Sequence, residues 1–210
     1  MPKTPLLGPV RAALLAALLC APAFAQNNVV AGVLRYRGFT VDLSQAQDVP
    51  DPAGVEASVE HQIDIVAGCG ASPKVLAFFR SQEVFLKPSK TDGGGRFTAN
   101  SPGVALDDVA MPFEKPILLH ELLHAFHWRV LPKGFQNPDI LLYYGRAKGA
   151  GYPEQYQNAY FLSNAREFFA VTGSLYLWGH VSRPPYDRAM LKAKQPFYYA
   201  WLGKLFGVQK

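Results

Sequence analysis

The segment PILLHELLHAFHWRVL, residues 116–131, constrains the fold more than any other part of the chain. Its leucines and aromatic residues recur at the spacing of a helix, so we expect one helix across the segment. The same helix carries His120, Glu121 and His124 among the leucines. Burying imidazoles and a carboxylate is costly unless each has a partner. The fold must therefore bring partners to these side chains.

Short apolar segments surround one helical pattern in the first half of the chain. Residues 33–43 (VLRYRGFTVDL) predict a strand, and the later segments EVFLK and GVALDD predict two more. Between them, Asp51 and Pro52 are typical of a helix start. The helix that follows has an apolar face, which consists of Val55, Val59, Ile63 and Val66. The first half therefore predicts a small sheet with helices.

From Pro116 onward the pattern is helical. Beyond residues 116–131, we expect helices after Asn137, around residues 164–178 and from Pro196. Either Ser163 or Asn164 can cap the second of these helices, and Gly179 is a typical stop. Together the two halves predict an α+β fold, with a small N-terminal mixed sheet and a helical C-terminal half.

The first 25 residues have the pattern of a signal peptide. A basic start and an apolar run lead to A-F-A, which ends at Ala25. The run is too short to span a membrane. We expect cleavage after Ala25 and a single domain, residues 26–210, that is exported to the periplasm or outside the cell. Lipid attachment at Cys20 is a less favoured alternative, because a bulky leucine precedes that cysteine.

The composition of residues 26–210 excludes several kinds of protein. They contain 19 basic and 16 acidic residues, and a net charge of +3 is too small to indicate a nucleic-acid partner. They contain no long apolar run, so we expect no stable membrane insertion. Cys69 is then the only cysteine, and its small apolar neighbours indicate a buried thiol rather than a disulfide. We favour a monomer.

His120, Glu121 and His124 form an H-E-x-x-H pattern. Residues four apart lie about 40° apart around a helix, roughly 6 Å along its axis. Both imidazoles can therefore bind one Zn²⁺, with bonds of about 2.0–2.1 Å. Glu121 points to one side, where it can accept a proton from a water on the metal. A histidine-rich helix without a metal is the alternative.

A catalytic zinc site needs a third protein ligand. Glu167 is the best candidate, because it lies near the start of a strong helix among apolar residues and needs a partner there. An ion pair with Arg166 or Arg188 would also satisfy it. His127 is a weaker candidate, since it lies about 10 Å along the helix from the first histidine of the motif. His180, in a loop, is weaker still.

These residues resemble the group of secreted zinc peptidases that contains the anthrax lethal factor catalytic domain and the Pro-Pro endopeptidases. The sequence E-F-F-A begins 43 residues after the second histidine, and a tyrosine precedes its glutamate by seven positions. The resemblance implies a zincin-like domain in which His120, His124 and Glu167 bind zinc. It also implies that Glu121 is the general base and that Tyr160 binds the oxyanion. A packed stripe of tyrosines, with Tyr152 and Tyr156, is the alternative for Tyr160.

The resemblance is one of pattern, over roughly residues 75–180. The group commonly has a second glutamate after E-F-F-A, where this chain has Val171, so another group must orient a metal-binding histidine. The group binds substrate along an edge strand, for which we expect residues 96–106, with residues 139–156 as the opposite wall.

We therefore expect an exported zinc-dependent metalloendopeptidase that hydrolyses peptide bonds in a protein or peptide substrate. One alternative is a zinc-dependent amidase acting on cell-wall peptides. Another is an inactive zinc-binding protein of the same fold, although neither Glu121 nor Tyr160 is needed merely to hold a metal.

Overall fold

The computed structural model describes residues 29–30, 32–46, 48–89, 93–179 and 181–210. The expected signal peptide, its cleavage site and His180 lie outside these ranges. The fold is α+β, as the sequence predicts, with a small mixed sheet and several helices. No helix in the described ranges is long and apolar enough to cross a membrane.

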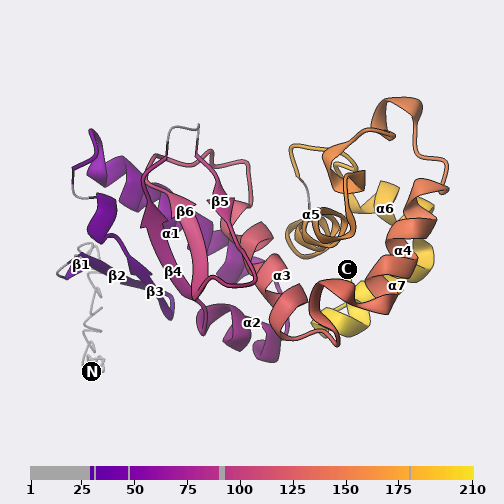
Figure 1. Ribbon diagram of the computed structural model, residues 1–210, viewed down its shortest axis with the longest axis horizontal. Helices are drawn as coiled ribbons and strands as arrows, with labels where there is room; N and C mark the ends of the chain where they lie inside the picture. The colour runs from indigo at the N-terminus through magenta and orange to yellow at the C-terminus, as the bar shows by residue number, and fades with distance from the viewer. Residues whose placement is uncertain (1–28, 31, 47, 90–92, 180) are drawn as a thin grey trace, which may run out of the picture.

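A six-stranded mixed sheet forms one side of the molecule (Figure 1). In spatial order its strands are β1 (Val29–Val30), β2 (Val33–Tyr36), β3 (Phe39–Asp42), β4 (Glu83–Lys87), β6 (Gly103–Asp107) and β5 (Gly95–Arg96). β4 is parallel to both β3 and β6, and the other pairs are antiparallel. β5 is thus a two-residue strand at one edge of the sheet.

The segment 33–43 is a hairpin and not the single strand that its apolar residues predict. Arg37 and Gly38 both have positive φ, 46° and 83°, and reverse the chain between β2 and β3. Two successive residues in this conformation are typical of the tight turns that join antiparallel strands. Arg37 is held by an ion pair with Asp64 on the neighbouring helix. The glycine was the signal for this turn in the sequence.

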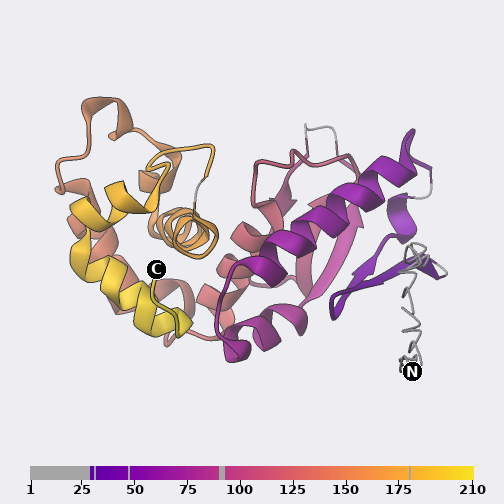
Figure 2. The ribbon, with the colours of Figure 1, turned by 180° about the vertical axis from the view of Figure 1, so that it is seen from behind.

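Helix α1 (Pro52–Gly68) covers one face of the sheet (Figure 2). Asp51 caps it as predicted, because its carboxylate accepts a hydrogen bond from the Gly54 amide. The predicted apolar face of α1 is fully buried. The sheet contributes alternate residues to the same core, among them Val41, Val84 and Leu86. Helix α2 (Pro73–Arg80) leads from α1 into β4.

The helical half consists of α3 (Ile117–Arg129), α4 (Pro138–Lys148), α5 (Ala165–Trp178), α6 (Arg188–Lys194) and α7 (Pro196–Phe206). Asn137 caps α4 as predicted. Of the two candidates for α5, Asn164 is the cap, and Gly179 ends the helix with φ 116°. The sequence analysis did not predict the short helix α6.

Helices α3 and α5 pack against each other at the centre of the molecule (Figure 1). Gly173 of α5 permits this, because a Cβ at that position would lie 3.1 Å from Leu123 of α3. Phe126 and Phe169 flank the contact, and both rings also meet Phe206 of α7. The close packing brings the first turn of α5 over the middle of α3.

The start of α3 is fixed by a side chain of α1. The N-cap position of α3, Pro116, makes no side-chain hydrogen bond to the helix. Instead the fully buried Gln62 donates to the Lys115 carbonyl at 2.7 Å and accepts from the Leu118 amide at 3.1 Å. The Leu118 amide is one of the backbone donors that a helix start leaves unpaired, and the Lys115 carbonyl also accepts from the Ile117 amide at 2.9 Å.

We predict that Gly103→Ala destabilises the protein by about 3 kcal/mol or more, because a Cβ there would clash with the Glu83 carbonyl in the neighbouring strand β4. The measurement is the free energy of unfolding in urea. Gly145→Ala in α4 is the control, since nothing lies within 4 Å of that Cβ. It should stabilise by about 0.5–1 kcal/mol. Equal effects of the two substitutions would contradict the steric argument.

Candidate metal centre

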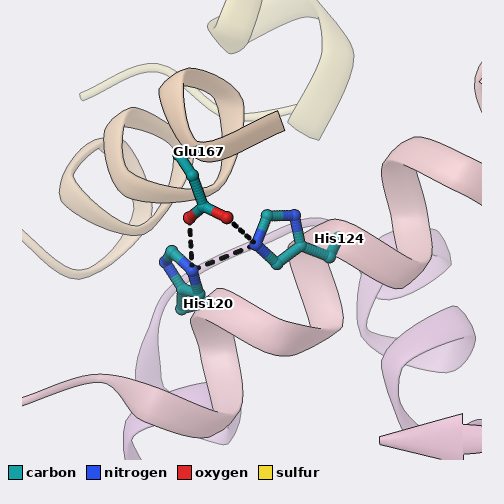
Figure 3. Close-up of side chains that lie close together, drawn as sticks. All are labelled: His120, His124 and Glu167. Atoms are coloured by element: carbon teal, nitrogen blue, oxygen red, sulfur yellow. Dashed lines mark hydrogen bonds and ion pairs between the residues drawn. The ribbon is translucent and has the colours of Figure 1, made fainter. Parts of the chain in front are cut away.

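His120, His124 and Glu167 converge where α5 crosses α3 (Figure 3). The two Nε2 atoms lie 3.1 Å apart. The Glu167 carboxylate presents one oxygen to each imidazole, with Oε2 3.1 Å from His120 Nε2 and Oε1 3.4 Å from His124 Nε2. One potential ligand atom from each residue lies within 4.8 Å of the others. The structure thus brings together all three ligands that the sequence predicts.

The spacing of these atoms fits one metal ion. Tetrahedral ligands about 2.0–2.1 Å from a zinc ion lie roughly 3.3 Å from one another. The distance between the two Nε2 atoms and the distance from each of them to one Glu167 oxygen are close to this value, and the two imidazoles meet different oxygens. Burial opposes ionisation of Glu167, but hydrogen bonds from both imidazoles outweigh it and hold the pKa of this carboxyl below its usual range. The Glu167 side chain is therefore negatively charged, and this charge favours the binding of a cation.

The alternative partners of Glu167 are occupied elsewhere. The guanidinium of Arg166 lies over the Phe135 ring, 4.4 Å from its centre. Arg188 donates to the carbonyls of Tyr176 and Leu177 at the other end of α5. Glu167 itself is aimed by its place in the first turn, where its amide donates to the Asn164 side chain at 3.1 Å.

Glu121 lies beside the three ligands without joining them. Its Oε1 is 4.0 Å from His120 Nε2, and the residue is 7% exposed. Burial raises the pKa of Glu121 to about 7, even though His124, the Phe97 amide and Arg96 each lower it. A carboxyl group with such a pKa can both accept and donate a proton near neutral pH.

The edge of the sheet holds Glu121 in place. The backbone N–H of Phe97, directly after β5, donates a hydrogen bond to its carboxylate. Gly95 lies so close that a Cβ there would be 2.7 Å from Glu121 Cγ. The run of three glycines in the sequence, Gly93–Gly95, thus lies at the site.

Tyr160 lies beside His120, in a 3-10 turn (Tyr160–Leu162) before α5. Its ring centre is 6.4 Å from that of His120, and its hydroxyl hydrogen-bonds to Glu167. Burial and the negative charge of Glu167 raise the pKa of Tyr160 above its usual value, so the hydroxyl keeps its proton. Tyr152 and Tyr156 pack elsewhere, against Phe161 and Tyr186. The three tyrosines therefore do not form one stripe.

Two pockets flank the three ligands. The Glu121 pocket, about 220 Å³, is lined by His120, Glu121, Tyr160, Gly93–Gly95 and residues 181–183, among others. The Trp128 pocket, about 360 Å³, is lined by His124, Glu167 and aromatic residues that include Trp128 and Phe135. Both pockets border the chain around β5. The site is thus open to an extended ligand on both sides.

Two of the expected walls need correction. The predicted edge strand 96–106 divides into the end of β5, which is the edge, and most of β6, which lies inside the sheet. Residues 139–156 line neither pocket. Their place is taken by Tyr160 and residues 181–183 on one side and by Phe135 and Gln136 on the other. These loop residues carry no periodic signal that the sequence analysis could use.

His127 is a packing residue and not a ligand. Its side chain is fully buried, with ring contacts to Phe135 and Phe169. Among the described residues, neither ring nitrogen has a hydrogen-bond partner, and burial lowers the pKa of His127 to about 4. His124 Nδ1 likewise has none within the described ranges, so neither Val171 nor another described residue orients this imidazole through Nδ1.

No protein-family model, no curated protein and no solved structure matches the chain significantly.

We predict that His127→Leu reduces the loss of stability at acid pH. The folded protein keeps His127 neutral down to about pH 4, whereas the unfolded chain protonates it near pH 6.5. The stabilising effect of a neutral His127 is therefore complete above pH 6.5 and is lost as the pH falls toward 4.

The measurement is the free energy of unfolding at pH 7 and pH 4.5, with a chelator present so that metal loss does not contribute. The difference between the two pH values should shrink by on the order of 2 kcal/mol in the variant. If this difference in free energy did not change, the His127 ring would have a hydrogen-bond partner in solution.

Proposed function

We propose that this protein is an exported zinc-dependent metalloendopeptidase with a zincin-like domain, active in the periplasm or outside the cell. The observation that carries the proposal is the arrangement of five side chains. His120, His124 and Glu167 each offer one ligand atom to the same small region, and Glu121 and Tyr160 lie next to His120.

Zinc is the metal that this ligand set suits best. Two imidazole nitrogens and one carboxylate oxygen are a common donor set of catalytic zinc, which leaves a further position for water or substrate. Hard cations such as Ca²⁺ and Mg²⁺ prefer oxygen ligands throughout. The proposed ion supplies a Lewis acid for the peptide carbonyl and lowers the pKa of the attacking water.

Glu121 is the proposed general base and acid. Its carboxylate accepts the proton of the attacking water, and the pKa near 7 lets it return that proton to the leaving amine. The Phe97 amide and the close approach of Gly95 keep the carboxylate in one position through both transfers.

Tyr160 is the proposed oxyanion donor. Its hydroxyl keeps its proton because the pKa is raised, and its ring lies beside His120. In the free protein this hydroxyl donates to Glu167. A bound substrate would present a better acceptor as negative charge develops on its carbonyl oxygen.

The pockets on both sides of the ligands support an endopeptidase. An extended peptide can pair with the backbone of β5 and place side chains in the Glu121 pocket and the Trp128 pocket at the same time. An amidase for cell-wall peptides would use the same centre. A protein that only stores zinc would not need Glu121 and Tyr160 in these positions.

We predict that Glu121→Gln keeps its zinc and loses hydrolysis by a factor of about 10³ or more, because it removes the proton acceptor but no ligand. The measurements are zinc content by elemental analysis and cleavage of a fluorogenic peptide library. Tyr160→Phe should also keep zinc and lose activity by about tenfold to a hundredfold. Full activity of Glu121→Gln would disprove the mechanism.

We predict that Glu167→Ala weakens zinc binding by at least about a hundredfold, because one of three protein ligands is removed. The measurement is competition with a fluorescent zinc chelator. Glu154→Ala, an exposed acid outside the site, is the control and should bind zinc as the unmodified protein does. Native affinity in Glu167→Ala would mean that another residue is the third ligand.

A further inference from the structure

The Glu121 pocket has a positively charged rim. Arg183 lines it with its guanidinium over the Tyr160 ring, 4.9 Å from the ring centre, and Lys115 lines it as well. In the described part of the chain, no ion pair involves Arg183. Among the described residues that line it, Glu121 is the one acid, and the proposed mechanism already uses it.

The backbone around Arg183 is held in a turn. The Arg183 carbonyl accepts from the Tyr186 amide at 3.0 Å, and the Tyr186 carbonyl accepts from the Val181 amide at 3.2 Å. Val181 is buried and anchors this turn to the core. The guanidinium is therefore presented to the pocket from a fixed base, stacked on an aromatic ring. Such stacking reduces the freedom that the long side chain would lose on binding a ligand.

The lining of the Glu121 pocket also contains a buried hydroxyl that has no hydrogen-bond partner among the described residues. Ser174 of α5 is 1% exposed, and its Oγ makes no hydrogen bond to the described residues. Ser174 lines the pocket next to Val171, one turn earlier on the same helix. Because an unpaired buried hydroxyl is costly, a ligand group that accepts a hydrogen bond from it is favoured there.

We propose that the Glu121 pocket binds a carboxylate of the substrate, on the leaving-amine side of the scissile bond. This inference rests on the proposed peptidase function and names its substrate class. Arg183 binds the carboxylate, Lys115 adds positive charge, and Ser174 donates a hydrogen bond to the group that enters most deeply. A guanidinium matches a carboxylate with two parallel hydrogen bonds, which a neutral amide cannot reproduce.

The side of the scissile bond follows from Glu121. This residue returns the proton to the leaving amine, so the amine lies next to it. Glu121 lines the pocket with Arg183, and it does not line the Trp128 pocket on the other side of the ligands. The residue that follows the scissile bond therefore meets Arg183.

The carboxylate has two possible sources. A volume of about 220 Å³ suits one side chain, so an aspartate or glutamate directly after the scissile bond fits. The C-terminal carboxylate of a peptide cut one residue from its end presents the same group. Peptides that differ only in these two features separate the sources.

The test uses the zinc-loaded protein and peptides of one sequence, identified from a cleavable library, with glutamate or glutamine after the scissile bond. Each peptide is made with a free and an amidated C-terminus. We expect kcat/KM to be about tenfold or more higher for glutamate than for glutamine if the side chain is the source. A preference for the free C-terminus instead assigns the pocket to the terminal carboxylate.

Substitution of Arg183 tests whether this side chain distinguishes a carboxylate of the substrate from a neutral amide. Arg183→Gln should reduce the preference for carboxylate over amide to about one, and Arg183→Glu should reverse it in favour of a lysine peptide. Arg166→Gln is the matched control. Arg166 also stacks on an aromatic ring but lines the Trp128 pocket, so this variant should keep the preference.

Binding separates this inference from the proposed function. The zinc-loaded Glu121→Gln protein is titrated with the same peptides by calorimetry, which needs no hydrolysis. Tighter binding of the carboxylate peptides, lost on adding Arg183→Gln, supports the pocket even if the unmodified protein cleaves none of them. Cleavage or binding of all peptides with equal efficiency overturns the inference and leaves the peptidase proposal in place.

Discussion

The candidate centre depends on how closely α5 approaches α3. The two histidines lie on one helix and the carboxylate lies 43 residues later on the other, so no local interaction can join them. Packing of Leu123 against Gly173 sets the distance between the helix axes, and the aromatic contacts to Phe206 fix their relative orientation. A Cβ at position 173 would lie 3.1 Å from Leu123 Cδ1, so a larger residue would require this leucine to shift. The hydrophobic core thus determines the geometry of a polar site.

The same packing also sets the chemical character of Glu121. The Glu121 side chain projects from α3 and is covered by β5, and this burial raises its pKa toward neutrality. Glu167 is less deeply buried and is paired with two imidazoles, so its pKa moves in the opposite direction. Two carboxyl groups a few ångströms from the same histidines therefore differ in protonation, which suits one for proton transfer and the other for metal binding.

The sequence predicted those features that local patterns determine. The helix caps at Asp51 and Asn137, the strands β4 and β6, and the pair His120 and His124 follow from short-range spacing, and Glu167 was identified by its apolar surroundings. The hairpin at Arg37 was missed because its two strands are each four residues long and read as one apolar run. The pocket rim at Arg183 was missed for a different reason. Loop residues meet the site through tertiary packing, which has no periodicity in the sequence.

Gln62 connects helix α1 to the start of helix α3. It lies on α1, which packs directly against α3, and makes two hydrogen bonds to the backbone at the start of α3. The axial position of the H-E-x-x-H segment relative to the sheet edge is therefore set 56 residues earlier in the chain. A substitution in α1 that displaces Gln62 would therefore also displace the start of the helix that carries His120 and Glu121. Variation in α1 can thus change the position of these side chains, although no residue of α1 lines either pocket.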